Sequence, residues 1–276
     1  MKLMEILFKI AEGALIGLGA VLPGISGGVL CVIFGVYKPI MELLSHPFKN
    51  FKTHVPKLLP IIIGTAIGFL GIANVLAFFL EKYPEPSVCL FVGLIAGMIP
   101  SLWREAGEKG RNKGSYVSLV VAGIAVFSIL YSLQIFSITI TPSFIWYIFC
   151  GFCLALSVIA PGMSFSILLM PLGLYTPFVD GIGKLNLEIL VPAGIGAVIT
   201  VIGLAKLVDT LFEHYYSVAF HAIVGIVTVA TIMIIPFGSF TESTTQFSVN
   251  SICLVIGVGS ALLLDRLNSG VNKEGY

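Results

Sequence analysis

Charged side chains are scarce in this chain. Asp, Glu, Lys and Arg make up 11% of its 276 residues, whereas hydrophobic residues make up 57%. A soluble domain usually carries about 25% charged residues, so water is not the solvent for most of this surface. The 15 basic and 14 acidic residues leave a net charge of +1, and no basic patch is present to neutralise phosphates along a nucleic acid. We therefore expect an integral membrane protein without a nucleic-acid partner.

Residues that usually carry metal or nucleophilic chemistry are also few. Cys150 and Cys153 form a C-x-x-C pair, but no second pair or histidine stands at ligand spacing, so helix packing is favoured over a metal site. No acidic cluster lies within an apolar run. None of the four histidines has the setting of a nucleophile; they are His46, His54, His214 and His221. The sequence predicts no enzyme, no metal and no cofactor. Because Glu5 and Glu12 interrupt the first apolar run, we also expect no cleaved signal peptide.

Six apolar runs are long enough to cross a membrane as helices. Each holds roughly 16 to 23 residues, and at about 1.5 Å of rise per residue the longer runs span a core of about 30 Å. They are too continuous for the alternating pattern of a membrane barrel. The expected fold is an all-α polytopic membrane protein. The runs are residues 58–80, 88–103, 116–134, 190–212, 218–236 and 249–267.

Two further apolar stretches carry the same interruption. Leu-Pro-Gly-Ile-Ser-Gly-Gly occupies residues 22–28, and Ala-Pro-Gly-Met-Ser-Phe-Ser occupies residues 160–166. Shifting the sequence by half its length aligns the two motifs, and a slightly shorter shift aligns later positions such as Gly64 with Gly196. Paired segments interrupted by Gly and Pro in two halves indicate the binding site of a transporter. We predict a first repeat over residues 1–138 and a second over residues 139–276.

The distribution of basic residues separates two topologies. Residues 12–44 and residues 145–180 can each cross the membrane once, or turn back at Pro-Gly as a re-entrant helical hairpin. With hairpins, all 15 basic residues except Lys82 and Lys184 face the cytoplasm, whereas single crossings give a much weaker bias. Each half then has one re-entrant hairpin and three spans. An odd number of crossings inverts the second half, so we predict an inverted-repeat bundle with both termini cytoplasmic.

The hairpin tips are the predicted binding site. Irregular backbone at membrane depth must line a polar cavity or be buried in protein. Proline ends the entering helix, glycine permits close approach of a ligand, and the start of the leaving helix suits an anion. A long kinked helix is the alternative for a single motif, but the recurrence favours hairpins. The candidate residues are Pro23, Gly24, Ser26, Gly27 and Gly28 at the first tip, and Pro161, Gly162, Ser164 and Ser166 at the second.

An anion site also calls for a cation, and Lys206 is the candidate within a span. An ionisable group at membrane depth costs about 3 kcal/mol to insert and therefore usually has a function. The repeat aligns Lys206 with Asn74 in the first half, which makes both residues candidates. Two alternatives stay open for Lys206: its side chain reaches to the cytoplasmic surface, or it pairs with Asp209.

The motif that runs from residue 18 to Gly-Val-Tyr at residues 35–37, with its echo at residues 161–175, resembles a bacterial membrane family. Its members are regarded as polyprenyl-phosphate transporters, which return undecaprenyl phosphate to the cytoplasmic leaflet for cell-wall synthesis. The resemblance covers nearly the whole chain. It implies a flippase of the bacterial cytoplasmic membrane, with the lipid head group at the two tips and Lys206. Val29 stands where the family usually has Thr, and Phe165 where it usually has a small residue.

Two other functions compete with this one. A secondary transporter of a small soluble anion would use the same tips but needs no opening towards lipid, so the shape of the cavity discriminates the two. A membrane-embedded enzyme acting on prenyl phosphates would need clustered acids or an activated histidine, which the sequence lacks. Coupling to a proton or sodium gradient is compatible with either transporter, but no relay residue stands out. The sequence leaves open the lipid chain length and the choice between monomer and dimer.

Overall fold

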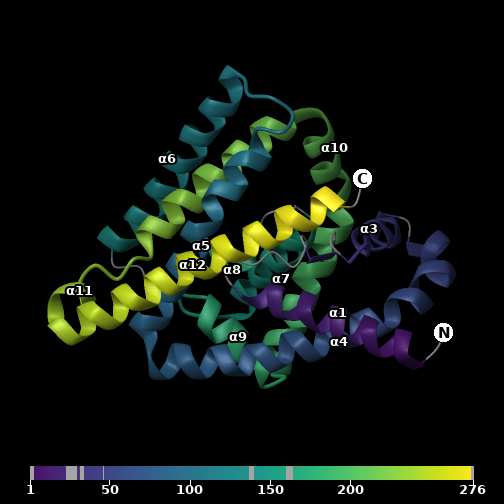
Figure 1. The fold of residues 1–276 in the computed structure, drawn as a ribbon, viewed down its shortest axis with the longest axis horizontal. Coiled ribbons are helices and arrows are strands. Elements are labelled where there is room, and N and C mark those ends of the chain that lie inside the picture. The colour runs from purple at the N-terminus through teal and green to yellow at the C-terminus, as the bar shows by residue number, and fades with distance from the viewer. Residues whose placement is uncertain are drawn as a thin grey trace. The chain divides into compact units, whose positions relative to one another are not determined.

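The computed structural model describes residues 3–22, 30–31, 34–45, 47–136, 140–159 and 164–274. These residues form helices and turns, without a β-strand (Figure 1). The all-α prediction is therefore confirmed. The helices are α1 (Leu3–Val21), α3 (Tyr37–Ser45), α4 (Pro47–Lys82), α5 (Pro84–Ala106), α6 (Lys113–Ile135), α7 (Phe144–Ile159), α8 (Phe165–Leu169), α9 (Tyr175–Gly183), α10 (Leu187–Met233), α11 (Ser239–Glu242) and α12 (Thr244–Glu274).

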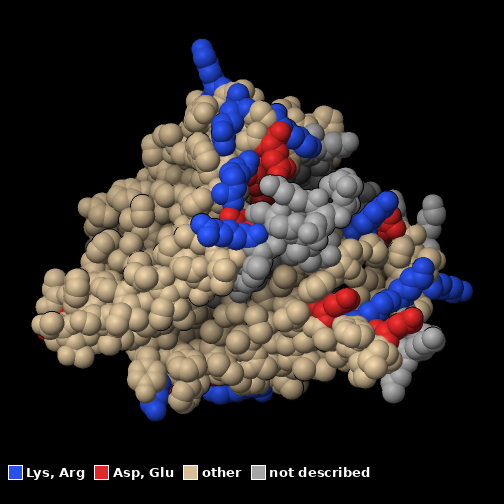
Figure 2. All heavy atoms as spheres, in the orientation of Figure 1, with Lys and Arg blue, Asp and Glu red and all other residues tan. Residues whose placement is uncertain are grey.

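Six helical segments of the described chain are long and apolar enough to cross a membrane, as predicted. Two of them belong to α10, which is interrupted by a non-helical residue at Tyr215 (φ −127°, ψ 32°). On the face drawn in Figure 2, uncharged surface predominates, as expected for a surface that meets lipid. The segments are Asn50–Lys82, Pro84–Ala106, Lys113–Ile135, Leu187–Leu204, His214–Met233 and Thr244–Leu263.

The chain folds into two compact units, and each unit draws on both halves of the sequence. Unit 1 comprises Met1–Ala77, Pro142–Ser166 and Thr176–Asp209. Unit 2 comprises Phe78–Thr141, Ile167–Tyr175 and Thr210–Tyr276. The predicted repeats are thus not the compact units; they concern the internal similarity of the two halves.

In unit 1, glycines bring α1 and α4 into backbone contact. A Cβ atom added to Gly13 would lie 2.2 Å from the carbonyl oxygen of Ile61, and one added to Gly64 would lie 2.0 Å from that of Ile10. Real side chains do not approach a backbone this closely, so only glycine fits at these two positions. The pair of helices runs side by side in Figure 1.

The second half repeats this contact with α7 and α10. A Cβ atom on Gly151 would lie 1.8 Å from the carbonyl oxygen of Ala193, and one on Gly196 would lie 1.9 Å from that of Ile148. The two sequence shifts align Gly151 with Gly13 and Gly196 with Gly64. The same close packing therefore recurs at aligned positions of the two halves.

Each motif also ends in the same turn, which was not predicted from the sequence. Gly35 (φ +66°) and Gly173 (φ +69°) have left-handed backbone conformations that side chains disfavour. The N–H group of the following residue donates to a carbonyl five residues earlier, at 2.8 Å to Cys31 and 3.0 Å to Leu169. This is the Schellman pattern that stops a helix. The Gly-x-Tyr end of each motif is therefore a helix stop, and α3 and α9 begin at its tyrosine.

The predicted hairpins are described only in part. α1 ends at Val21 and α7 ends at Ile159, each two residues before the proline of its motif. Both tips, residues 23–29 and 160–163, lie outside the described residues. That the chain turns back at these tips therefore stays a prediction.

In unit 2, α5 packs on α12, and α6 packs on the second part of α10. Glycines again permit the approach, since a Cβ atom on Gly93 or on Gly225 would lie 2.2 Å from a carbonyl oxygen of the facing helix. Near the end of α12, Asp265 accepts a hydrogen bond from the Ser101 hydroxyl (2.8 Å) and forms an ion pair with Arg104. Burial alone would raise the pKa of Asp265, but the bonds from Arg104 and Ser101 lower it. The pair thus ties α5 to α12 at a charged end.

Candidate functional site

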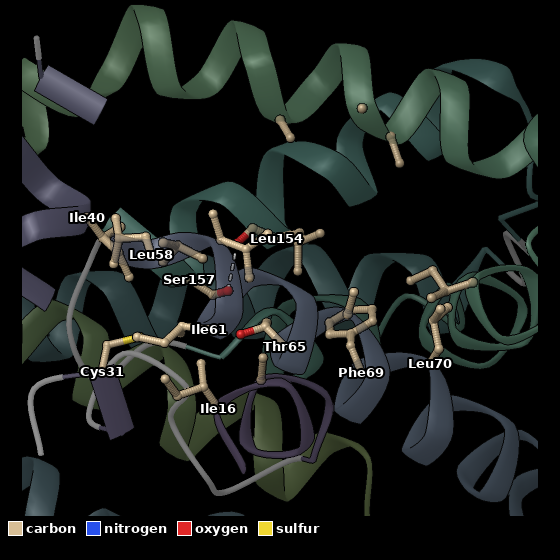
Figure 3. A pocket seen from close by; sticks show the side chains of 18 of the residues that line it. Ile16, Cys31, Ile40, Leu58, Ile61, Thr65, Phe69, Leu70, Leu154 and Ser157 are labelled. Atoms are coloured by element: carbon tan, nitrogen blue, oxygen red, sulfur yellow. Dashed lines mark hydrogen bonds between the residues drawn. The ribbon is translucent and has the colours of Figure 1, made fainter. Parts of the chain in front are cut away.

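Unit 1 contains a cavity of about 690 Å³, within the usual size range of ligand pockets (Figure 3). Helices from both halves of the chain form its wall. The lining includes Ile16 of α1, Ile40 of α3, Leu58 of α4, Leu154 of α7, Phe178 of α9 and Leu190 of α10. The helices before and after each Pro-Gly motif therefore line the same cavity.

The described wall of the cavity is almost entirely apolar. Its polar groups are hydroxyls, among them those of Thr65, Ser157 and Ser164. The Ser157 hydroxyl donates to the carbonyl oxygen of Leu154 at 2.7 Å, as the dashed line in Figure 3 shows, so it is engaged within its own helix. No charged side chain belongs to the lining that the structure describes. Such a wall suits hydrocarbon and gives no compensation for a buried charge.

The cavity is open to its surroundings. Among its lining residues, Ile62 on α4 is 50% exposed and Val158 on α7 is 39% exposed. Gly194 on α10 also lines the cavity and is exposed. All three positions are apolar, so hydrocarbon can contact them without loss.

Ser164 is the predicted site residue that the structure places at the cavity. It is 4% exposed, Ser166 is fully buried, and their hydroxyl oxygens lie 2.7 Å apart. α8 begins directly after Ser164. Ser166 is not part of the cavity wall. The remaining candidates at both tips fall outside the described residues; they are Pro23, Gly24, Ser26, Gly27, Gly28, Pro161 and Gly162.

Phe165, one of the departures from the family pattern, lies just behind the cavity wall. Its ring is fully buried, 6.4 Å from the ring of Phe69 and 5.9 Å from that of Phe178. Both neighbours line the cavity. The large side chain therefore fills space beside the cavity and helps to fix two of its walls.

Lys206 and Asn74 occupy different settings. Lys206 lies in α10, two residues beyond the segment Leu187–Leu204, and its side chain is outside what the structure describes. Asn74 is exposed, and it does not line the cavity. Its amide donates to the carbonyl oxygens of Leu70 and Gly183, both at 3.1 Å. In this structure Asn74 therefore connects α4 to the end of α9.

Replacing Asn74 by Ala is expected to loosen this connection. The variant loses one hydrogen bond between helices, so its free energy of unfolding should fall by about 1 kcal/mol. Thermal unfolding in detergent measures the change. Ser132→Ala is the control, because that hydroxyl donates to the carbonyl of Ser128 in its own helix and to no other group among the described residues. Loss of function at unchanged stability would contradict a purely structural role for Asn74.

The sequence matches one protein family and two named relatives. A family described as "Undecaprenyl phosphate translocase-like" matches residues 3–113 and 49–252. The "Polyprenyl-phosphate transporter" of Staphylococcus aureus is 26% identical over 275 residues, covering 95% of this chain and 96% of the relative. That of Vibrio cholerae is 25% identical over 265 residues, covering 91% and 83%. No solved structure matches the chain.

These matches confirm the family resemblance drawn from the two Pro-Gly motifs. They also confirm that the chain is a transporter and not an enzyme, since the family and both relatives are transporters by name. Together with the six apolar helices, they make this a multi-pass membrane protein.

Proposed function

The chain belongs to the undecaprenyl phosphate translocase-like family, and we propose that it is a flippase for undecaprenyl phosphate or a related polyprenyl phosphate. It would act in the bacterial cytoplasmic membrane, with both termini in the cytoplasm. Its task would be to return the lipid carrier to the cytoplasmic leaflet. Lipid-phosphate transport follows from the names of the two relatives; direction and preferred lipid are the finer part of the proposal.

The observation that carries the proposal is the apolar, open cavity of unit 1. An isoprenoid tail is a hydrocarbon and gains free energy from an apolar wall, at about 25 cal/mol per Å² buried. A small soluble anion would instead need cations or hydrogen-bond donors around it. The described lining carries no charged side chain. The lipid therefore fits this cavity better than the alternative substrate does.

The phosphate head needs other partners, and the two tips would supply them. A lipid monophosphate carries about −1.5 to −2 charges near neutral pH. Ser164 lies at the cavity wall and directly follows residues 160–163 of the second tip. Backbone N–H groups of a Gly-rich tip and a hydroxyl beside them suit such an anion. In this proposal the head binds at the tips, near Lys206, while the tail occupies the cavity.

Alternating access would follow from re-entrant turns at both motifs. If both motifs turn back, the halves are inverted relative to each other, and rocking between them would expose the tips to alternate faces of the membrane.

Head-group translocation in liposomes tests this function. Purified protein should move labelled undecaprenyl phosphate between leaflets. The double variant Ser26→Ala/Ser164→Ala should slow it by at least about tenfold, because each lost hydrogen bond to a charged group is worth about 1.5–3 kcal/mol. Lys206→Ala tests the cation in the same assay. Lys82→Ala is the control, since its ammonium lies over the ring of Phe78 and Lys82 is not among the lining residues of the cavity.

Two results would count against the proposal. The absence of lipid movement, with or without a pH or sodium gradient, would exclude a flippase. Uptake of a soluble anion by the same liposomes would favour the alternative transporter. If all variants move the lipid like wild type, the lipid is still the substrate, but its head group does not bind at the tips.

A further inference from the structure

The cavity of unit 1 is too small for a whole undecaprenyl tail. An apolar cavity of about 150 Å³ in a protein interior binds one benzene molecule, which corresponds to about 25 Å³ for each carbon atom. On that scale the cavity of about 690 Å³ holds about 28 carbon atoms, or roughly five isoprene units. An undecaprenyl tail has eleven such units, as its name states. The remaining units of a bound lipid must therefore lie outside the cavity.

The exposed part of the wall shows where those units can go. Ile62 of α4, Val158 of α7 and Gly194 of α10 line the cavity and are exposed. The nearby surface has the same character, since Ile67 of α4 is 58% exposed and Val198 of α10 is 57% exposed. A tail that leaves the cavity past these helices meets apolar side chains and then the hydrocarbon of the bilayer.

An open apolar wall does not distinguish long tails from longer ones. Hydrocarbon gains little by moving from the bilayer onto an apolar protein surface, because lipid tails are as apolar as Leu. Each unit beyond the cavity therefore has nearly the same surroundings in the bound lipid as in the free lipid. Selection for tail length would need a closed end at a fixed distance from the head group.

The units next to the phosphate meet a part of the wall that is firmly packed. Ser164, which lies at the cavity wall beside the second tip, directly precedes Phe165. The buried Phe165 ring lies 6.4 Å from the Phe69 ring and 5.9 Å from the Phe178 ring, and both of these rings line the cavity (Figure 3 labels Phe69). Rings that pack on one another hold a fixed shape, against which the first units of a tail can pack.

We propose that the protein recognises polyprenyl phosphates as a class, by the phosphate and roughly the first five isoprene units, while the rest of the tail stays in the bilayer. The proposal rests on the flippase function proposed above and names the range of its substrates. Tails of about five units or more are then equivalent. Shorter tails leave part of the cavity unfilled, so its wall loses contacts.

Photo-crosslinking tests which part of the tail the cavity holds. Two analogues of undecaprenyl phosphate carry a diazirine, one on the second isoprene unit and the other on the last, and each is irradiated with the protein in liposomes. Mass spectrometry should find the second-unit probe on wall residues such as Ile61, Leu154 and Phe178. The last-unit probe should label these residues at least about tenfold less, because its diazirine stays in the bilayer.

A pair of tryptophan variants controls this experiment. An added Cβ meets nothing within 4 Å at Gly194, which lines the cavity, or at Gly203, which does not. Gly194→Trp should therefore reduce labelling of the wall by the second-unit probe, whereas Gly203→Trp should leave it unchanged.

Transport of tails of different length gives an independent measurement. Labelled polyprenyl phosphates with three, five and eleven units are compared at equal density in the liposome membrane. The two longer lipids should move at rates within about twofold of each other, because the cavity holds the same part of both. The three-unit lipid should move at least about tenfold more slowly, because nearly half of the cavity would be unfilled.

The outcomes separate this proposal from the flippase function. Equal labelling of the wall by both probes, or a rate that rises further between five and eleven units, would overturn the proposal. A three-unit lipid that moves as fast as the longer ones would also overturn it. Labelling of the wall by the second-unit probe alone, in a protein that moves no lipid, would support this binding mode and refute the flippase function. Lipid movement without labelling of the wall by either probe would refute the binding mode and keep the function.

Discussion

Replacing Gly64 by Ala is expected to prevent stable folding, whereas Gly71→Ala on the same helix is expected to be tolerated. A Cβ atom at Gly64 would lie 2.0 Å from the carbonyl oxygen of Ile10, and one at Gly71 would meet nothing within 4 Å. The atom in the way is backbone, which cannot rotate aside, so α1 and α4 must separate. Overpacking costs about 1–3 kcal/mol and more when a backbone must move, out of a total stability of about 5–15 kcal/mol.

Comparing the two variants separates the effect of the close backbone contact on stability from the effect of replacing a glycine in a helix. Ala is a better helix former than Gly by about 1 kcal/mol, so Gly71→Ala should be as stable as wild type or slightly more stable. Size-exclusion profiles in detergent and thermal unfolding give the readout. The second half supplies a replicate, since Gly151→Ala brings a Cβ to 1.8 Å from the Ala193 oxygen while Gly203→Ala is unobstructed. A wild-type melting temperature for Gly64→Ala would disprove this packing.

The spans were predictable because the membrane leaves the chain little choice. An apolar run of sufficient length can satisfy its backbone there only as a helix. The runs at 190–212 and 218–236 were expected as two helices, and they occur as α10 on either side of the break at Tyr215. The turns at Gly35 and Gly173 were missed because a Gly-x-Tyr triplet inside an apolar run has no hydropathy signal. Their left-handed conformation appears only in the backbone.

The functional side chains were harder to predict, for a different reason. In an apolar span, a residue that lines a cavity has the same composition as one that faces lipid, so hydropathy could not select Ile62 or Gly194. The Pro-Gly motif did point to Ser164, because a break in a helix is visible in the sequence.

Filling the cavity from α10 is expected to stop transport without unfolding the protein. Gly194 lines the cavity and has nothing within 4 Å of an added Cβ, so Gly194→Trp can place its indole in the cavity. Such a ring would occupy space that the lipid tail needs. Translocation of labelled undecaprenyl phosphate should fall by at least about tenfold, equivalent to about 1.4 kcal/mol of lost binding.

Gly203→Trp is the matched control for this variant. Gly203 lies on the same helix, is exposed and also has nothing within 4 Å of an added Cβ, but it is not part of the cavity wall. The two variants therefore share the residue change, the helix and the free space, and differ only in whether the indole can reach the cavity. Wild-type translocation by Gly194→Trp, at unchanged thermal stability, would show that the lipid does not pass through this cavity. A selective loss in Gly194→Trp would tie transport to the apolar chamber itself, because neither helix propensity nor general folding distinguishes the two positions.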